Sequence, residues 1–422
     1  MSVLTRLRGL LLIVRRSLRE HLLSTLVTAL SAALGVGLVT AVFCLAEQSR
    51  AAFTGGALGF DAVLGARGSR VQLVLNSVFH LETSPGNLPW SAYTDIAARR
   101  GVAAAIPLVT GDNVRGFRVV GTSPEFFAVA ERAPGEPPAL LAGRVFEPER
   151  REAVLGASAA RGTGLRVGAR FHVTHDVSEH GHEHAEEFVV VGVLADTGTP
   201  ADRVVWLPLE AVFRLDSHVL RGGGTEYRPQ DGVPIPDSAK ELSAVLLRLR
   251  DPVVGLGLDN EINRVGDRAT LAWPVDRTVA ELFESLGWVS GVLRVVAYLV
   301  MLLAAASILA SLHNTLRERR REFAVLRALG ARRRDVFAVV VLESTAIAFL
   351  GALLGLAVHV GVLALAASVV RGATGVFVDV FAWHPVLVLA PLGMTALGAC
   401  AGLLPAAEAY ATDVAANLQR AT

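Results

Sequence analysis

Four apolar runs limit what this sequence can fold into, because each is long enough to cross a lipid bilayer as a helix. The hydrocarbon core is about 30 Å thick and requires roughly 20 helical residues. The runs cover residues 22–46, 289–313, 336–366 and 385–404. We therefore expect an α-helical membrane protein with four transmembrane helices. Although 52% of the 422 residues are hydrophobic, enough polar sequence is left for a sizeable folded domain.

The distribution of arginine predicts which segments lie in the cytoplasm. The leader, residues 1–21, contains five arginines, and the connection between the second and third runs, residues 314–335, contains eight. The connection between the third and fourth runs, residues 367–384, contains only Arg371. Because short arginine-rich flanks stay on the cytoplasmic side, we place the basic connection there. The leader, expected as an amphipathic helix, and the tail, residues 405–422, belong on the same side.

The long segment between the first two runs, residues 47–288, is expected on the opposite side of the membrane. The helical stretch "LPWSAYTDIAARR" is followed by β-branched runs such as "RGFRVVGTS" and "EEFVVVGVLA", which predicts a large α+β domain. A β-rich insertion at about residues 125–240 is expected between two halves of one subdomain. Apolar residues at 3–4 spacing from Val279 to Val300 predict a helical seam. It is one face of a helix packed on a neighbour, a stalk that continues into the second membrane helix, or both.

Sequence motifs of common enzyme classes are missing from these 422 residues. A phosphate-binding loop of an ATPase ends in Gly-Lys-Ser/Thr, whereas the only lysine, Lys240, follows Ala239. Neither an H-E-x-x-H pair nor a G-x-S-x-G elbow occurs. We therefore expect no enzymatic activity, no catalytic residue and no cofactor-binding residue in this chain. A formal net charge of +1 gives no overall electrostatic case for nucleic acid.

Histidine and acidic residues are concentrated in the stretch "HVTHDVSEHGHEHAEE" of the outer segment. Neutral imidazoles together with carboxylates suit zinc or copper. The candidate metal ligands are His175, His180, His182 and His184. The alternatives are a solvated hairpin tip between two strands, where a polar composition is common, and a pH-sensitive contact.

Two glycines in the third run, Gly351 and Gly355, lie one turn apart and allow another helix to approach closely. That helix belongs either to the same chain or to a second subunit. Glu343, near the inner end of the same run, is expected to face an interface or a partner, because a carboxylate that faces lipid is costly. Snorkelling to the membrane surface is the simpler alternative for this residue.

A resemblance to a known family is carried by "RERRREFAVLRALGARRRDVFAVVVLESTAIAFLGALLGLAVHVG". This stretch closely resembles the signature of the MacB/FtsX-like family of ABC transporter permeases, in particular LolC/LolE-like membrane subunits without a fused ATPase. In the outer segment, "VVGTSPEFF" and "AGRVFEPERREAVLGASAA" resemble the family's periplasmic core domain, and "LLPAAEAYATDVAANLQ" resembles its usual ending. The histidine-rich stretch is not part of the family pattern.

The resemblance implies a multi-pass protein of the bacterial inner membrane, with the large domain in the periplasm. It implies a dimer with a second permease copy or a paralogue, and separate ABC ATPase subunits that bind ATP and Mg²⁺. The implied function is export or extraction of an amphiphilic substrate: a lipoprotein, lipid, peptide or drug. A periplasmic adaptor or substrate protein is a further expected partner. The alternatives are a mechanotransmitter that transports nothing and regulates a periplasmic partner such as a cell-wall hydrolase, and a metal-responsive sensor that uses the histidine-rich stretch.

The basic connection is expected to form a short coupling helix that docks on the ATPase. Its apolar residues at 3–4 spacing fit a groove on a partner protein, and its arginines suit acidic partner residues, anionic lipid heads or both. Arginines that only set the topology would not explain the apolar stripe, and we do not expect nucleic acid. The predicted coupling residues are Arg321, Glu322, Phe323, Leu326, Leu329, Gly330, Arg332 and Asp335.

Overall fold

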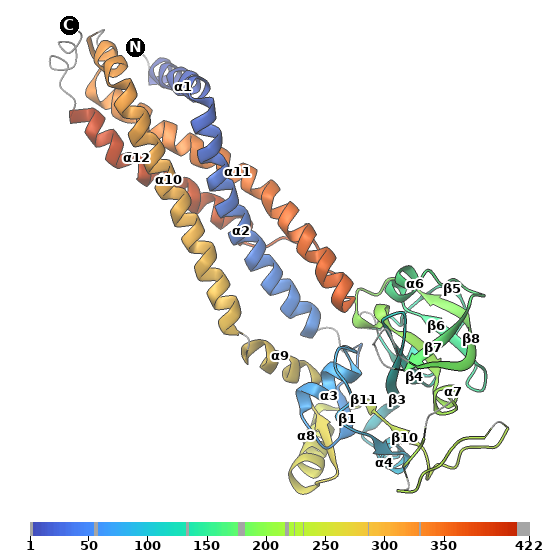
Figure 1. Ribbon diagram of the computed structural model, residues 1–422. Coiled ribbons are helices and arrows are strands. Elements are labelled where there is room, and N and C mark those ends of the chain that lie inside the picture. Colours follow the sequence, from blue (N-terminus) through green and yellow to red (C-terminus); the bar gives the residue numbers. More distant parts are fainter. Residues whose placement is uncertain are drawn as a thin grey trace. The chain divides into compact units, whose positions relative to one another are not determined.

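A computed structural model describes most of the chain, namely residues 3–54, 58–131, 135–175, 182–215, 219–222, 224–230, 232–285, 287–328 and 331–411. The chain divides into two compact units. The helical unit comprises residues 1–48, 287–367 and 379–422. The sheet unit comprises residues 49–286 and 368–378 (Figure 1).

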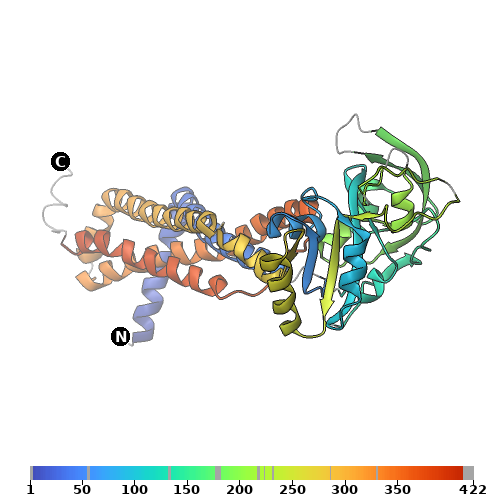
Figure 2. The same ribbon diagram turned by 90° about the horizontal axis from the view of Figure 1, so that it is seen from below.

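The described part of the helical unit is built from five helices. They are α1 (Val3–Glu20), α2 (Leu22–Thr54), α10 (Gly287–Ala328), α11 (Arg333–Thr374) and α12 (Val386–Ala411). The four long helices run side by side, whereas α1 lies across their direction (Figures 1 and 2). Each long helix contains a stretch that is long and apolar enough to cross a membrane. These stretches are Leu22–Ala51, Gly287–Asn314, Arg333–Thr374 and Val386–Glu408.

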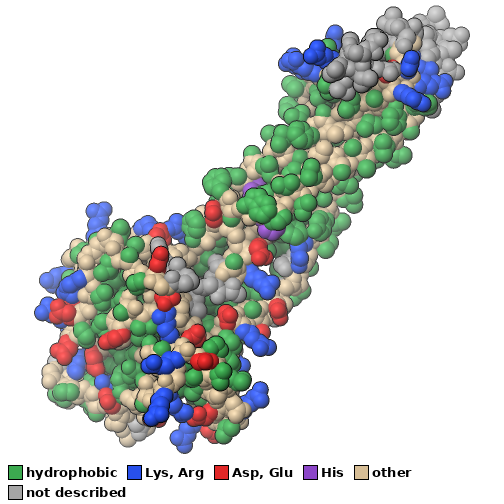
Figure 3. Space-filling model, turned by 180° about the vertical axis from the view of Figure 1, so that it is seen from behind, with side chains coloured by type: hydrophobic (Ala, Val, Ile, Leu, Met, Phe, Trp, Pro, Cys, Tyr) green, Lys and Arg blue, Asp and Glu red, His purple; other side chains and the backbone are tan. Residues whose placement is uncertain are grey.

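The surface of the long helices is apolar, as a lipid-facing surface must be. Large side chains such as Leu26, Leu302, Phe349 and Leu392 are exposed on it. Figure 3 shows hydrophobic side chains covering the long helices, with basic side chains gathered at one end of the helical unit. In α1, Val14 and Ser17 are buried while its arginines from Arg8 onwards are exposed, so that this helix is two-sided.

Small residues allow α2 and α11 to pack closely within the same chain. A Cβ added at Gly351 would lie 2.6 Å from the Cβ of Ala32 and 2.7 Å from the carbonyl oxygen of Ala29. A Cβ added at Gly355 would lie 2.8 Å from the Cβ of Val36. Since real Cβ contacts are longer, only glycine fits at these two positions of α11. Of the two alternatives given by the sequence, the structure has the helix of the same chain.

The predicted short coupling helix, residues 314–335, is not a separate element. Residues 314–328 continue α10, and α11 begins at Arg333. The physical reason lies in the composition: from Val292 to Leu329 there is neither glycine nor proline, and Arg, Glu, Leu and Ala are strong helix formers. Helix propensity does not change at the end of an apolar run, so the helix continues past it. Likewise, α11 extends to Thr374, which makes part of the predicted 367–384 loop helical.

In the sheet unit, the described strands form one ten-stranded mixed sheet and a small two-stranded sheet. The strand order is β12-β1-β11-β3-β4-β9-β6-β8-β5, and β7 pairs with both β3 and β8. The strands are β1 (Ala62–Ala66), β3 (Val102–Val114), β4 (Phe117–Thr122), β5 (Leu140–Gly143), β6 (Glu152–Leu155), β7 (Arg170–His175), β8 (His182–Leu194), β9 (Val205–Pro208), β11 (Ala244–Leu249) and β12 (Ala269–Ala272). The small sheet pairs β2 (Leu88–Pro89) with β10 (Glu241–Leu242).

Helices pack on this sheet and bury its central strands. They are α3 (Arg70–Ser77), α4 (Trp90–Ala97), α5 (Phe126–Val129), α6 (Ala157–Thr163), α7 (Leu209–Phe213), α8 (Pro252–Asp259) and α9 (Val275–Ser285). A 3₁₀-helix at Pro200–Arg203 and a π-helical turn at Asn260–Val265 accompany them. All of β1 is buried. Because side chains alternate along a strand, Val63 packs in one cluster with Leu73 of α3, while Leu64 packs in another with Ile96 of α4.

Residues 140–208, which lie within the predicted insertion, extend the same sheet and share its core. Their strand β9 pairs in parallel with β4. Trp206 of β9 stacks on Phe126 of α5 with ring centroids 4.3 Å apart, in the cluster that also contains Val63 and Ile106. The described residues of the predicted seam from Val279 to Val300 lie in α9 of the sheet unit and in α10 of the helical unit, and the seam residue Leu286 lies outside the described residues.

Candidate functional site

The basic connection joins the end of α10 to the start of α11. The backbones of Arg321, Glu322, Phe323 and Leu326 lie in α10, but their side chains are outside what the structure describes. Leu329 and Gly330 also lie outside the described residues, whereas Arg332 and Asp335 are described. The backbone N–H of Arg332 donates a hydrogen bond to Oδ2 of Asp335, at 3.0 Å. An acidic side chain that accepts from the N–H three residues earlier is half of a capping box, so Asp335 fixes where α11 begins.

The first turns of α11 are tied to α1 and α12. The Ser17 hydroxyl of α1 donates a hydrogen bond to the Glu343 carboxylate, and the exposed fractions of the two residues are 1% and 5%. Val336 and Val340 pack with Ala406 of α12. The structure therefore gives Glu343 an intramolecular partner at the expected inner end of α11.

Further along the same pair of helices, α12 contacts α11 through small residues. A Cβ added at Gly398 would lie 2.2 Å from the Cβ of Ala348, and one added at Gly402 would lie 2.1 Å from the Ser344 hydroxyl oxygen. On α12, Glu408 pairs with His313 of α10 across 3.4 Å. α12 thus contacts both helices that flank the basic connection, α10 and α11.

The last residues of α11 pack within the sheet unit. Arg371 forms an ion pair with Asp196, and the backbone N–H of Phe377 donates to the carbonyl oxygen of Gly198, at 3.2 Å. Burial raises the pKa of the neighbouring Asp202 to about 6, although hydrogen bonds to its carboxylate oppose that shift. Residues 368–378 therefore dock on the loop that precedes β9.

Two of the four predicted metal ligands come together in the sheet unit, with an aspartate that the sequence did not point to. Asp112 of β3, His175 of β7 and His184 of β8 each offer a ligand atom within 4.8 Å of the others. Nδ1 of His175 lies 2.8 Å from Oδ1 of Asp112, and Nε2 of His184 lies 3.5 Å from the same oxygen. His180 lies outside the described residues, as does the side chain of His182.

The backbone explains why Asp112 reaches the histidines. β3 pairs with β4 through an irregularity between Thr110 and Asn113. Asp112 lies in this irregular stretch, between the residues of β3 that are in register with β4. It pairs directly with His175 across the antiparallel strands β3 and β7. Such irregularities redirect side chains. A polar stretch rich in histidine predicts exposure, yet His184 is only 2% exposed.

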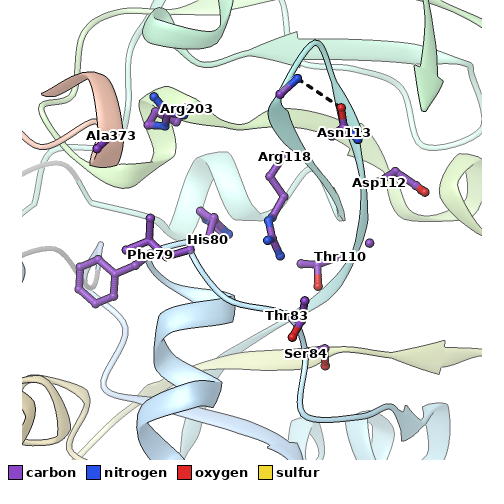
Figure 4. A pocket seen from close by; sticks show the side chains of 13 residues that line it. Phe79, His80, Thr83, Ser84, Thr110, Asp112, Asn113, Arg118, Arg203 and Ala373 are labelled. Atoms are coloured by element: carbon purple, nitrogen blue, oxygen red, sulfur yellow. Dashed lines mark hydrogen bonds between the residues drawn. The ribbon is translucent and has the colours of Figure 1, made fainter. Parts of the chain in front are cut away.

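A pocket of about 370 Å³ lies beside this cluster, on the same strand β3. Figure 4 shows Arg118 extending into it between Thr110 and His80. The guanidinium of Arg118 donates a hydrogen bond to the carbonyl oxygen of Glu82 at 2.7 Å. Burial lowers the pKa of Arg118. Burial also lowers the pKa of His80 to about 3, an effect to which the charge of Arg118 adds. His80 is therefore neutral near pH 7. This pocket could not be predicted from local sequence patterns, because its residues come from separated segments.

Comparisons with known proteins match most of the chain. A family model described as "MacB-like periplasmic core domain" matches residues 25–253, more than half of the sequence. A second model, described as "FtsX-like permease C-terminal", matches residues 294–414. The two matches together contain the strands from β1 to β11, the basic connection and most of each of the four apolar helices.

Individual relatives are more distant. The macrolide export ATP-binding/permease protein MacB of Bdellovibrio bacteriovorus is 25% identical over 269 residues, which is 61% of this chain and 38% of that protein. The chain thus spans about two fifths of the length of this curated relative. Among solved structures, the periplasmic region of MacB from Actinobacillus actinomycetemcomitans matches 55% of this chain and 95% of that one, with 13% identity and a TM-score of 0.33.

Proposed function

Because the chain belongs to the MacB/FtsX-like family of ABC transporter permeases, we propose that it is the membrane subunit through which a separate ATPase drives a conformational change in the periplasmic domain. The family resemblance and the fold class expected from the sequence are confirmed: four apolar helices accompany a periplasmic core domain with a mixed sheet. The chain is an ABC transporter permease component in the membrane. The coupling mechanism, the orientation and the substrate are our proposal.

The observation that carries the proposal is the continuity of α11. It begins three residues after Gly330 in the basic connection, and Asp335 caps its start. Its first turns contact α1 and α12. From Ser368 onwards its residues belong to the sheet unit, where Arg371 pairs with Asp196. One helix therefore has residues in both units, and a push at its beginning acts on an element that the sheet unit holds at its end.

The ATPase is proposed to dock on the basic connection from the cytoplasmic side. The exposed Arg332, Arg333 and Arg334 and the exposed arginines of α1 support this orientation. The sequence contains no Gly-Lys-Ser/Thr loop, which favours an ATPase on another chain, with ATP and Mg²⁺ bound there. Two permease subunits, identical or paralogous, with two ATPase subunits complete the proposed assembly.

The proposed activity is export or extraction of an amphiphilic substrate at the periplasmic face. The name of the relative from Bdellovibrio bacteriovorus refers to the export of macrolides, which are amphiphilic molecules. The strands of residues 140–208 enlarge the sheet and add surface for a substrate or an adaptor protein. These observations favour transport over the regulation of a periplasmic hydrolase.

The test is co-purification of the tagged full-length chain from its native membranes. Wild type is expected to retain a P-loop ATPase, identified by mass spectrometry, and Mg-ATP hydrolysis. Arg321→Glu reverses a charge in the basic connection, and Phe323→Asp places a charge in the apolar stripe, so both should lose the ATPase. Arg16→Glu is the matched control, since Arg16 is an exposed arginine of α1 whose side chain is 83% accessible. Retention of the ATPase by both variants would place the docking surface elsewhere.

A further inference from the structure

The cluster of Asp112, His175 and His184 is a built site rather than a group of surface side chains. The side chains of Asp112 and His184 are 2% and 1% exposed, whereas that of His175 is 59% exposed. The three residues come from three strands and are brought together by backbone pairing. His172 adds support, because its Nδ1 lies 3.2 Å from the carbonyl oxygen of His184. One side of the cluster is therefore fixed in the core and the other is open to solvent.

We propose that Asp112, His175 and His184 bind one divalent transition-metal cation of the zinc type, which ties β3 to the β7–β8 hairpin. This site is independent of the proposed coupling to an ATPase. No member of the cluster was placed in the coupling machinery, and the general pattern of the family does not require it.

The donor set selects the class of cation. Two imidazole nitrogens and one carboxylate oxygen are typical zinc ligands, and three protein ligands leave a fourth tetrahedral position for water. Magnesium and calcium prefer sites made of oxygen atoms. The cluster thus has the composition of a zinc, copper or nickel site rather than that of an alkaline-earth site.

The two distances to the Asp112 carboxylate can be compared with the geometry of a tetrahedral zinc site. Zinc bonds of about 2.1 Å at tetrahedral angles separate ligand atoms by about 3.4 Å. Nε2 of His184 and Oδ1 of Asp112 are already 3.5 Å apart. Nδ1 of His175 and the same oxygen are 2.8 Å apart, a hydrogen-bond distance that must widen by roughly half an ångström. Because the His175 side chain is exposed, its ring can move by this amount without disturbing the core.

Burial gives the cluster a reason to bind a cation. An ionised carboxylate is costly to bury unless opposite charge and hydrogen bonds compensate it. Asp112 is only 3% exposed and faces two imidazoles, and a divalent ion supplies the compensating charge directly. The pairing of Asp112 with His175 across β3 and β7 holds both ligands before the ion arrives, which lowers the entropy that binding must overcome.

The experiment uses the full-length chain, purified in detergent, stripped with a chelator and titrated with Zn²⁺ by calorimetry. We expect one equivalent to bind, and Mg²⁺ or Ca²⁺ at the same concentration to leave that binding unchanged. Asp112→Asn and His175→Ala should each weaken binding by at least tenfold, since even residues that only orient ligands cost roughly 10- to 100-fold. Zn²⁺ should also raise the melting temperature of wild type, and much less that of Asp112→Asn.

Two further variants separate this site from the rest of the histidine-rich stretch. His180→Ala and His182→Ala remove histidines of the same stretch and keep the proposed three ligands. His175→Ala changes an exposed side chain, so its melting temperature without metal should stay near that of wild type. The proposal is overturned if wild type binds no zinc. It is also overturned if Asp112→Asn and His175→Ala bind zinc as wild type does, whether or not the His180 or His182 variant loses zinc binding. Copurification of the ATPase should be unaffected by Asp112→Asn.

Discussion

The packing of α2 against α11 makes a prediction that can be tested with a single methyl group. Changing Gly351 to Ala introduces a Cβ that would lie 2.6 Å from the Cβ of Ala32 and 2.7 Å from the carbonyl oxygen of Ala29. Non-bonded carbon atoms are best separated by 3.5–4.0 Å. The two helices must therefore separate locally by about 1 Å, and one of the obstructing atoms belongs to the backbone, which yields less readily than a side chain.

The size of the effect follows from two opposing contributions. Overpacking of this kind costs about 1–3 kcal/mol, while alanine is favoured over glycine in a helix by about 1 kcal/mol. Gly361, in the same helix, has no atom within 4 Å of an added Cβ, so Gly361→Ala receives only the second contribution. The difference between the two variants isolates the steric cost, about 1–3 kcal/mol.

The assay is thermal unfolding of both purified variants in the same detergent. At about 2–4 °C per kcal/mol, Gly351→Ala should melt roughly 2–12 °C below Gly361→Ala. A Gly351→Ala protein that melts at or above the temperature of the Gly361→Ala protein would refute the reasoning. It would mean that Gly351 does not face α2, and that the glycine pair is available to a second subunit instead.

Two further predictions concern the sheet unit. Because the pKa of His80 is lowered to about 3, the unfolded chain binds more protons than the folded one between about pH 6.5 and 3. Stability should therefore fall as the pH is lowered through that window. The variant His80→Asn, whose side chain tolerates the positive φ of this residue, should lose less melting temperature over the same pH range. Equal acid sensitivity of the two proteins would contradict a lowered pKa of His80. Glu152 accepts two hydrogen bonds from Arg144, at 2.7 and 2.5 Å, and one from the backbone N–H of Glu147. Removal of these hydrogen bonds by Glu152→Ala should cost about 1–3 kcal/mol in unfolding free energy, a range that allows for the half-exposed Arg144 regaining water. The control Arg170→Ala breaks the exposed pair with Glu187 and should cost less than about 1 kcal/mol. Equal losses in the two variants would show that the burial of Glu152 does not strengthen its ion pair.

The apolar helices could be predicted from the sequence because a run of 20 or more apolar residues has few alternatives in water or lipid. Their ends could not. The residues from Leu316 to Ala328 include many charged side chains but are mostly strong helix formers, so that α10 continues past the end of the apolar run. The predicted separate helix came from a change of composition that the backbone does not follow.

The candidate metal site could be predicted only in part, because one of its three residues is distant in the sequence. His175 and His184 were identified by their residue type, but Asp112 stands far from them in the sequence and joins them only through the pairing of β3 with β7. The pocket with His80 and Arg118 also depends on long-range pairing. Local patterns in a single sequence contain information on residue type and periodicity, whereas these sites require the strand order.

The position of β1 in the sheet has a consequence for how the protein is made. β1 is synthesised early, as residues 62–66, yet the strands on its two sides are β11 and β12, residues 244–249 and 269–272. Nearly the whole sheet unit must therefore leave the ribosome before this strand obtains either neighbour. Pairing between strands so distant in sequence is slow. Until it is complete, the apolar strand β1 has unpaired backbone N–H and C=O groups on both edges. Biogenesis of this protein should thus be most vulnerable to proteolysis and aggregation in the interval between the insertion of α2 and the emergence of residue 272.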